Sequence, residues 1–279
     1  MLRLGYNTNG FNCHSLEAAI AIIAGLGYRG VAITLDNYVL NPAASDLDRQ
    51  LDMTHALLKE NSLACVIETG ARFLLDPWRK HEPTLISADA AGRKIRLDFL
   101  KRALDIAVRL DGLALSFWSG IKHQDVNQAD AWQWLGDGCR ELANYAGQSG
   151  LPLAFEPEPG MLVENLAQYQ KLAEQVQNPL FGLTLDVGHA FLTENARLAD
   201  CIRKFHRSIK NIHLEDMRAG RHQHLQFGDG EINFSEVFDA LNEIQYEGLI
   251  NVELSLHSRN AVQAAGQAFD FLSKYQSHS

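Results

Sequence analysis

Short apolar runs alternate with longer segments of helical period along the whole chain. The apolar runs, which predict β-strands, are RLGYNT, GVAITLD, LACVIET, LALSFWS, LPLAFEP, FGLTLD, IKNIHLED and GLINVELS. The segments whose apolar residues recur at helical spacing are 15–26, 46–61, 92–110, 128–149, 163–177, 194–207, 234–244 and 259–275. Ser15 stands where it can cap the first helix, and Asn178-Pro179 should end the fifth.

Eight β-α pairs in a chain of 279 residues predict an α/β protein with the (β/α)8 TIM barrel architecture, as a single domain over residues 1–279. An open, doubly wound sheet is the alternative, but YNTNGFN after the first strand does not match its G-x-G-x-x-G turn. The longest predicted loops are 69–91 and 215–233, and both follow strands. Loops of this length in a compact domain are commonly functional.

Polar residues stand where the predicted strands end, and a barrel brings these ends together at one mouth. They are Asn7, Asp36, Glu68, Ser116, Glu156, Glu158, Asp186, His189, His213, Glu215, Asp216 and Glu253. The last four strands should present Glu156, Asp186, His213 and Glu253 at about one level. Carboxylates this close cannot all stay ionised in a partly dry site without a countercharge. One divalent cation would supply that charge, and the oxygen-rich donor set suits Mn²⁺, Mg²⁺ or Co²⁺, with Zn²⁺ also open.

Each of these side chains has an ordinary structural interpretation when taken alone. A carboxylate at a strand end is often a helix N-cap or a salt-bridge partner, and His213 inside an apolar strand could be a hydrogen-bonded core residue. The succession of four strands, each ending in a group that can bind a metal, is what favours a common site.

Composition and charge argue against some classes of binding partner. The formal net charge is −9 and no run of Lys and Arg forms a basic face, which argues against nucleic acid. The four cysteines are widely separated, which is typical of reduced thiols in a cytoplasmic protein. Neither a signal segment nor an apolar run of about 18 residues is present, so no membrane association is expected.

Five motifs resemble those of the xylose-isomerase-like TIM barrel superfamily, which includes the sugar phosphate isomerases and epimerases. In order, they are LAFEPEPG, LTLDVGHA, IKNIHLED, HLQFGDGEINF and NVELS. Their order and spacing agree with the superfamily over nearly the whole chain, although the first half matches mainly in architecture. The resemblance implies a metal held by Glu156, Asp186, His213 and Glu253. It also implies that Glu156 and Glu253 are the acid/base pair on opposite faces of a bound sugar.

The resemblance further implies residues that bind substrate. His189 matches the histidine of a D-x-x-H motif, which contacts substrate in the epimerases and metal in the abasic-site endonucleases of the superfamily. His224, upstream of GDGEINF, matches another site histidine. Arg218 or Arg221 would replace a substrate-binding arginine that follows strand seven, although neither falls at a clean match.

Three more residues at the strand ends are candidates for substrate contacts. Glu68, at the end of strand three, is one of them. Glu158, two residues after Glu156 in FEPEPG, could hydrogen-bond substrate hydroxyls or face solvent. Trp118 could stack on a sugar ring or fill the core, and both interpretations stay open.

Positive charge is concentrated in the segment ETGARFLLDPWRKHEP of an otherwise acidic chain. Arg72, Arg79, Lys80 and His81 lie in a loop that should overhang the mouth. An anionic substrate, such as a sugar phosphate or a carboxylate, would explain these residues through arginine forks. A solvated loop with ordinary surface ion pairs explains them equally well.

The predicted function is a divalent-metal-dependent isomerase or epimerase of a sugar, sugar phosphate or related polyhydroxy keto compound, acting through a metal-stabilised enediolate. The alternatives are a metal-dependent dehydratase of the inosose or dehydroshikimate type, and a non-catalytic metabolite-binding barrel. An abasic-site endonuclease is disfavoured, because strands three and four end in Glu68 and Ser116-Phe117-Trp118 and lack the extra histidines of a trinuclear zinc cluster. The sequence does not indicate the oligomeric state, and a homo-oligomer stays open by analogy with related barrels.

Overall fold

Eight parallel strands close into a barrel in a computed structural model that describes residues 2–70 and 72–276. The predicted domain also included residues 1, 71 and 277–279, which lie outside the described residues. In order around the barrel the strands are β1 (Arg3–Asn7), β10 (Leu249–Val252), β7 (Ile209–Leu214), β6 (Phe181–Asp186), β5 (Leu153–Glu156), β4 (Leu115–Trp118), β3 (Ala64–Glu68) and β2 (Gly30–Thr34). The predicted (β/α)8 architecture is confirmed, and the open doubly wound sheet is excluded.

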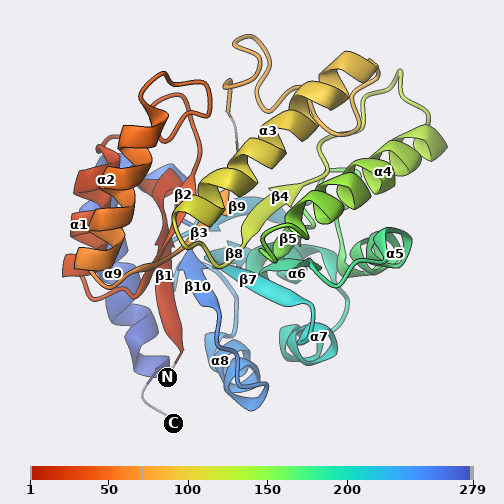
Figure 1. The fold of residues 1–279 in the computed structure, drawn as a ribbon. Coiled ribbons are helices and arrows are strands. Elements are labelled where there is room, and N and C mark those ends of the chain that lie inside the picture. The colour runs from red at the N-terminus through yellow and green to blue at the C-terminus, as the bar shows by residue number, and fades with distance from the viewer. Residues whose placement is uncertain (1, 71, 277–279) are drawn as a thin grey trace.

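Helices surround the barrel (Figure 1). They are α1 (Leu16–Gly25), α2 (Leu47–Glu60), α3 (Ala90–Arg109), α4 (Gln128–Ala146), α5 (Leu166–Val176), α6 (Val187–Thr193), α7 (Leu198–Phe205), α8 (Phe234–Glu243) and α9 (Ala261–Leu272), with 3-10 turns η1 (Thr8–Phe11), η2 (Ser255–Asn260) and η3 (Ser273–Tyr275). The two ends of the chain meet, because the Gln276 side chain donates to the Leu2 carbonyl at 2.8 Å. Among the described residues, no helix is both long and apolar enough to cross a membrane.

Local sequence signals account for several helix ends. Ser15 caps α1 as predicted, because its Oγ accepts a hydrogen bond from the backbone N–H of Ala18 at 3.2 Å. Helix α5 ends at Val176, and Gln177 follows in the left-handed conformation with φ 52°. The next residues, Asn178-Pro179, then lead into β6, in agreement with the sequence.

The structure departs from the prediction after β6 and after β7. A helix was predicted only over 194–207, but α6 starts directly after β6 and α7 follows separately. The region 215–233, predicted as a loop, contains an antiparallel hairpin of β8 (Asp216–Arg218) and β9 (Arg221–Leu225). Buried Asp216 fixes the segment beyond the hairpin, since its carboxylate accepts from the N–H groups of Gly228 and Gly230 at 2.9 Å each.

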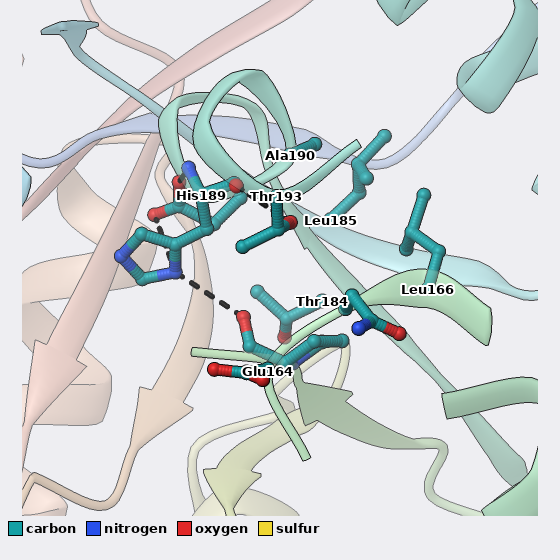
Figure 2. Close-up of a pocket in the computed structure, with 10 residues that line it drawn as sticks. Glu164, Leu166, Thr184, Leu185, His189, Ala190 and Thr193 are labelled. Atoms are coloured by element: carbon teal, nitrogen blue, oxygen red, sulfur yellow. Dashed lines mark hydrogen bonds and ion pairs between the residues drawn. The ribbon is translucent and has the colours of Figure 1, made fainter. Parts of the chain in front are cut away.

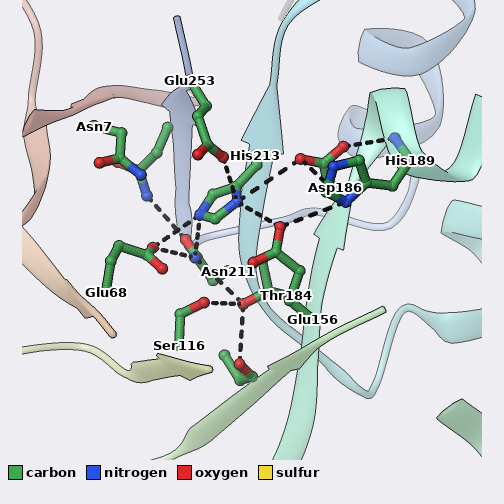
Figure 3. Close-up of polar contacts among 12 residues, drawn as sticks. Asn7, Glu68, Ser116, Glu156, Thr184, Asp186, His189, Asn211, His213 and Glu253 are labelled. Atoms are coloured by element: carbon green, nitrogen blue, oxygen red, sulfur yellow. Dashed lines mark hydrogen bonds and ion pairs between the residues drawn. The ribbon is translucent and has the colours of Figure 1, made fainter. Parts of the chain in front are cut away.

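A polar layer crosses the inside of the barrel just below its mouth. The hydroxyls of Ser116 and Thr184 lie 2.9 Å apart, and the Asn211 amide donates to Glu68 Oε1 at 3.0 Å. Each pair joins strands that are not neighbours in the sheet, so these contacts run through the barrel interior (Figure 3). Barrel interiors are usually filled by branched apolar residues. A buried polar layer here therefore marks the region that supports a site.

The long β3–α3 loop is tied to the mouth of the barrel at its first residues. The guanidinium of Arg96, on α3, donates to the carbonyl of Thr69 at 3.1 Å, and Thr69 Oγ1 donates to the Ser116 carbonyl at 2.8 Å. Further along the loop, Nδ1 of His81 lies 2.6 Å from the carbonyl oxygen of Gly70. These contacts hold part of the loop over the strand ends.

Candidate metal centre and active site

A cavity of about 400 Å³ opens at the carboxyl ends of the barrel strands. This volume falls in the range of small-molecule sites. The sequence-predicted site residues that line it are Glu68, Arg72, Trp118, Glu156, Glu158, His189, His213, His224 and Glu253. Asp186 lies directly beneath, at the end of β6, and is 2% exposed. The sequence therefore located the mouth of the barrel and most of the side chains that surround its cavity.

Glu156, Asp186, His213 and Glu253 come together at the floor of this cavity, as expected. Each offers one ligand atom, and these atoms all lie within 4.8 Å of one another. Nδ1 of His213 is the centre of the group, at 3.1 Å from Glu156 Oε1 and 2.9 Å from Glu253 Oε2. Asp186 Oδ2 lies 3.9 Å from the same nitrogen. We call these four residues the acidic cluster (Figure 3).

The acidic cluster holds more negative charge than its surroundings satisfy. Burial raises the pKa of Glu156 well above its usual value, although His213 opposes this effect. Burial acts in the same direction on Glu253, but His213 outweighs it and the pKa of Glu253 falls below its usual range. The imidazole is affected in turn: burial lowers the pKa of His213, and the carboxylates of Glu68 and Glu156 outweigh burial and raise it well above its usual value. His213 is thus the one group of the acidic cluster that can carry positive charge among its three carboxyl groups.

The donor set of the cluster fits a divalent cation. Asp186 Oδ2 is buried and has no hydrogen-bond partner among the described residues. A buried carboxylate oxygen without a donor is costly unless a cation or proton reaches it. Three carboxylates and one imidazole nitrogen are ligands for which Mn²⁺, Mg²⁺, Co²⁺ and Zn²⁺ compete. The residues present therefore suit a divalent metal site, and the donor set leaves the choice of metal open.

A second group, of three imidazoles, borders the acidic cluster. His189, His222 and His224 also bring their nitrogen atoms within 4.8 Å of one another, so this group too could hold an ion. Nε2 of His222 lies 2.9 Å from Nε2 of His189, whose Nδ1 is 3.2 Å from the Pro157 carbonyl oxygen. Burial lowers the pKa of His189 to about 4 and also lowers that of His222. These rings are therefore neutral and can exchange hydrogen bonds with each other or with hydroxyl groups.

The far side of His189 is closely packed. A void of about 10 Å³ borders the residue between the start of α6 and the segment that precedes α5 (Figure 2). That volume admits at most one water molecule. The hydroxyl of Thr193, one turn further along α6, donates to the His189 carbonyl at 2.9 Å. Among the described residues, the small void leaves little room beside His189, and the large cavity is where a ligand can reach its imidazole.

Glu68 lies in the cavity wall, but its carboxylate is already engaged. Oε1 is 2.8 Å from Nε2 of His213 and accepts a hydrogen bond from the Asn211 amide at 3.0 Å. Glu158 also lines the cavity, and burial raises its pKa to about 7. Trp118 borders the cavity and is only 7% exposed, so its stacking on a sugar ring stays a prediction beside its place in the core.

The arginines expected after strand seven lie outside the cavity. Arg218 is exposed, and its Nε donates to the carbonyl of Asp229 at 2.9 Å. Arg221 is also exposed and does not line the cavity. From the same hairpin, His222, Gln223 and His224 line the cavity, whereas Arg221 does not. The sequence interpretation chose the charged residues of the hairpin and missed His222, although the H-x-H spacing in RHQHL was a signal for it.

The cationic residues of the β3–α3 loop divide into paired and unpaired groups. Arg72 borders the cavity, but its Nε donates to Asp36 Oδ2 at 3.0 Å. Arg79 lies outside the cavity lining and pairs with Asp76 at 2.7 Å. Lys80 borders the cavity and forms no ion pair within the described part of the chain. The surface-pair interpretation therefore holds for the two arginines.

Comparison with known proteins establishes the family. The model of the xylose isomerase-like TIM barrel family matches residues 20–275, so the chain belongs to this family. Inosose dehydratase 2 of Bacillus cereus is 30% identical over 150 residues, which are 48% of this chain and 50% of that protein. The sequence match thus spans about half the length of this curated relative.

Solved structures share the fold over the full chain. A D-tagatose 3-epimerase-like protein superimposes with a TM-score of 0.81 at 20% identity, covering 99% of this chain and 97% of that one. The IOLI protein, crystallised with a zinc atom, gives a TM-score of 0.77 at 17% identity, covering 99% of this chain and 100% of that one. At these identities the likeness shows the fold alone.

Proposed function

We propose that this protein is a metal-dependent enzyme that isomerises or epimerises a sugar, a sugar phosphate or a related polyhydroxy keto compound. The observation that carries the proposal is the acidic cluster at the floor of an open cavity. Its two glutamates reach the same nitrogen of His213, one from the end of β5 and the other from the residue after β10 (Figure 3). Two carboxylates that enter one cavity from different strands suit a proton transfer between the two faces of a small substrate bound there.

Glu156 and Glu253 would act as the acid/base pair. One carboxylate removes the proton from the carbon beside the substrate carbonyl, and the other delivers a proton to the opposite face, which inverts that carbon. Glu253 is held in place for this role, because the Asn9 amide donates to its Oε1 at 2.6 Å. When bound by the acidic cluster, a divalent cation polarises the carbonyl and stabilises the negative charge that develops there.

The remaining cavity residues would bind and orient the substrate. The rings of His189, His222 and His224 can donate to or accept from hydroxyl groups, and Glu158 also lines the cavity. Trp118 supplies an apolar edge against which a sugar ring can pack. A wall rich in short-range hydrogen-bonding groups suits a polyhydroxy compound better than an apolar one.

An anionic group on the substrate would be bound by Lys80, the cavity-lining cation of the β3–α3 loop that has no carboxylate partner within the described residues. Arg79, next in sequence and paired with Asp76, provides a matched control. We expect Lys80→Ala to raise KM for a sugar phosphate but not for the neutral sugar, and Arg79→Ala to change neither. An unchanged KM for the sugar phosphate in Lys80→Ala would show that Lys80 does not bind the substrate through its charge.

A dehydratase is the second candidate, and the curated inosose dehydratases that match half of the chain favour it. Such an enzyme would use the same base and cation but expel a β-hydroxyl group instead of returning a proton. NMR in D₂O separates the two reactions on a panel of keto sugars, sugar phosphates and inososes. Deuterium incorporation beside the carbonyl without loss of water supports epimerisation, and formation of a dehydrated product supports the lyase.

Glutamine variants test the enzymatic proposal itself. With Mn²⁺, Mg²⁺ or Co²⁺ present, we expect Glu156→Gln and Glu253→Gln each to lower kcat by about 100-fold or more, as for the loss of a general acid or base. Glu60→Gln, at the exposed end of α2, is the control and should retain wild-type activity. Full activity of both cavity variants would leave a binding role for the barrel and refute the proposed reaction.

A further inference from the structure

The two ring nitrogens of His213 face different partners. Nδ1 points to the acidic cluster, at 2.9 Å from Glu253 Oε2 and 3.1 Å from Glu156 Oε1. Nε2 points to the opposite side, at 2.8 Å from Glu68 Oε1. The ring is 2% exposed and therefore has little freedom to exchange these two directions. Each ring nitrogen of His213 therefore keeps its own set of partners.

We propose that Glu68 is a positioning residue that prepares His213 for the cation, and that it is not a substrate-binding residue. The inference rests on the proposed function, since it presumes that the acidic cluster binds a metal. An imidazole nitrogen must lose its proton to ligate a cation, while the other nitrogen keeps one. By accepting the Nε2 proton, the Glu68 carboxylate leaves Nδ1 free to ligate. Its charge also makes the imidazole a stronger base, as carboxylates behind metal-bound histidines do.

The surroundings of Glu68 fit this role. The residue is 6% exposed and ends β3, on the far side of the barrel from β7. Its Oε1 also accepts a hydrogen bond from the amide of Asn211, whose own carbonyl oxygen accepts from Asn251 at 2.9 Å. Nε2 of His213 and the Asn211 amide nitrogen both lie within hydrogen-bond distance of the same Glu68 oxygen, and they are 3.1 Å from each other. The Asn211 amide can donate to Glu68, which leaves Nε2 able to do the same. This buried chain of amides fixes the direction of the carboxylate before any ligand enters.

Metal affinity in the absence of substrate distinguishes positioning from substrate binding. Titration calorimetry with Mn²⁺ and chelator competition with Zn²⁺ would be measured on wild-type protein, Glu68→Gln and Ser116→Ala. Ser116 belongs to the same buried layer and hydrogen-bonds Thr184. We expect Glu68→Gln to weaken metal binding by about 10–100-fold. Ser116→Ala should bind as the wild type does.

An NMR measurement on the wild-type protein tests the inference without depending on whether a variant folds. In wild-type protein loaded with Zn²⁺, long-range ¹H–¹⁵N correlation of ¹⁵N-histidine should show His213 protonated at Nε2 and without a proton at Nδ1. A proton on Nδ1 would overturn the inference. Wild-type metal affinity in Glu68→Gln, with only KM for substrate changed, would overturn it in favour of substrate binding. Absence of metal binding by the wild-type protein would instead refute the proposed function, and the inference with it.

Discussion

The exchange of Asp186 for Asn separates two tasks of one side chain. Oδ1 accepts the backbone N–H of His189 at 2.7 Å and so caps α6. Asparagine keeps this cap, since its carbonyl oxygen accepts the same bond. Oδ2 belongs to the acidic cluster, and it has no hydrogen-bond partner in the residues that the structure describes. The exchange thus removes one charged ligand and leaves the start of α6 intact.

The magnitude follows from linkage between binding and folding. A cation that binds only the folded protein stabilises it by about 2.7 kcal/mol at 100 times its Kd. For a chain of this size, about 1 kcal/mol shifts Tm by about 2–4 °C, so the wild type should gain about 5–10 °C. If loss of the Asp186 charge weakens binding by about 100-fold, the same cation concentration yields about 0.4 kcal/mol and a Tm gain of about 1 °C.

The gain in Tm is measured from the stability of the metal-free wild type and the metal-free variant. Burial opposes ionisation of Asp186, but the nearby imidazoles of His189 and His224 outweigh it and lower its pKa. A depressed pKa in the folded state means that the ionised group contributes stability at neutral pH. Burial of Oδ2 without a donor acts in the opposite sense, so the metal-free stability of Asp186→Asn is measured beside that of the metal-free wild type. Only the increment in Tm on adding metal reports on the site.

Differential scanning calorimetry of EDTA-treated protein, repeated over a series of Mn²⁺, Mg²⁺ and Co²⁺ concentrations, measures this increment. The control is Asp125→Asn, which removes the same charge from an exposed loop position and should respond to metal as the wild type does. The reasoning fails if the wild-type Tm is independent of metal concentration. It also fails if Asp186→Asn gains as much as the wild type.

Two further predictions concern parts of the chain outside the acidic cluster. Of its four cysteines, the native protein should react with a thiol reagent at Cys13 alone, because the other three are buried. Burial also raises the pKa of Cys65 to about 12 and so disfavours its reactive thiolate. More than one fast-reacting thiol per chain would contradict this prediction. Asp216→Ala should lower the free energy of unfolding by about 3 kcal/mol in urea titrations, because it leaves the buried N–H groups of Met217 and Ile232 without this acceptor. Arg218→Ala, which removes an exposed side chain, should be near neutral.

The sequence predicted the barrel because strand and helix periods alternate without interruption. The run GVAITLD contains β2, and the positions of its neighbours agree equally well. The acidic cluster could be predicted for a related reason. In a closed barrel, the ends of successive strands lie at one rim, so residues that end β5, β6 and β7 must meet whatever the details of packing.

The remaining features depend on contacts that no local pattern encodes. The hairpin of β8 and β9 is short, and it is fixed by the Asp216 carboxylate binding backbone groups more than ten residues away. Its register decides that His222 faces the cavity and Arg221 does not. The pairing of Arg72 with Asp36 is likewise a contact between two separate loops. Because such pairs form between separate loops, the cationic residues seen in the loop sequence did not show which of them remain free to bind an anionic ligand.

One buried carboxylate outside the acidic cluster strengthens the physical case for a cation. Glu215 is fully buried, and neither of its oxygens has a hydrogen-bond partner among the described residues. Burial, with Asp186 and Glu253 adding to it, raises its pKa well above the usual value. The Glu215 side chain fits because residue 188 is glycine: a Cβ atom at Gly188 would lie 1.9 Å from Glu215 Oε1. Keeping several buried acids neutral or unpaired is costly, and a divalent cation bound by the acidic cluster would favour the ionised forms of these neighbouring carboxyl groups.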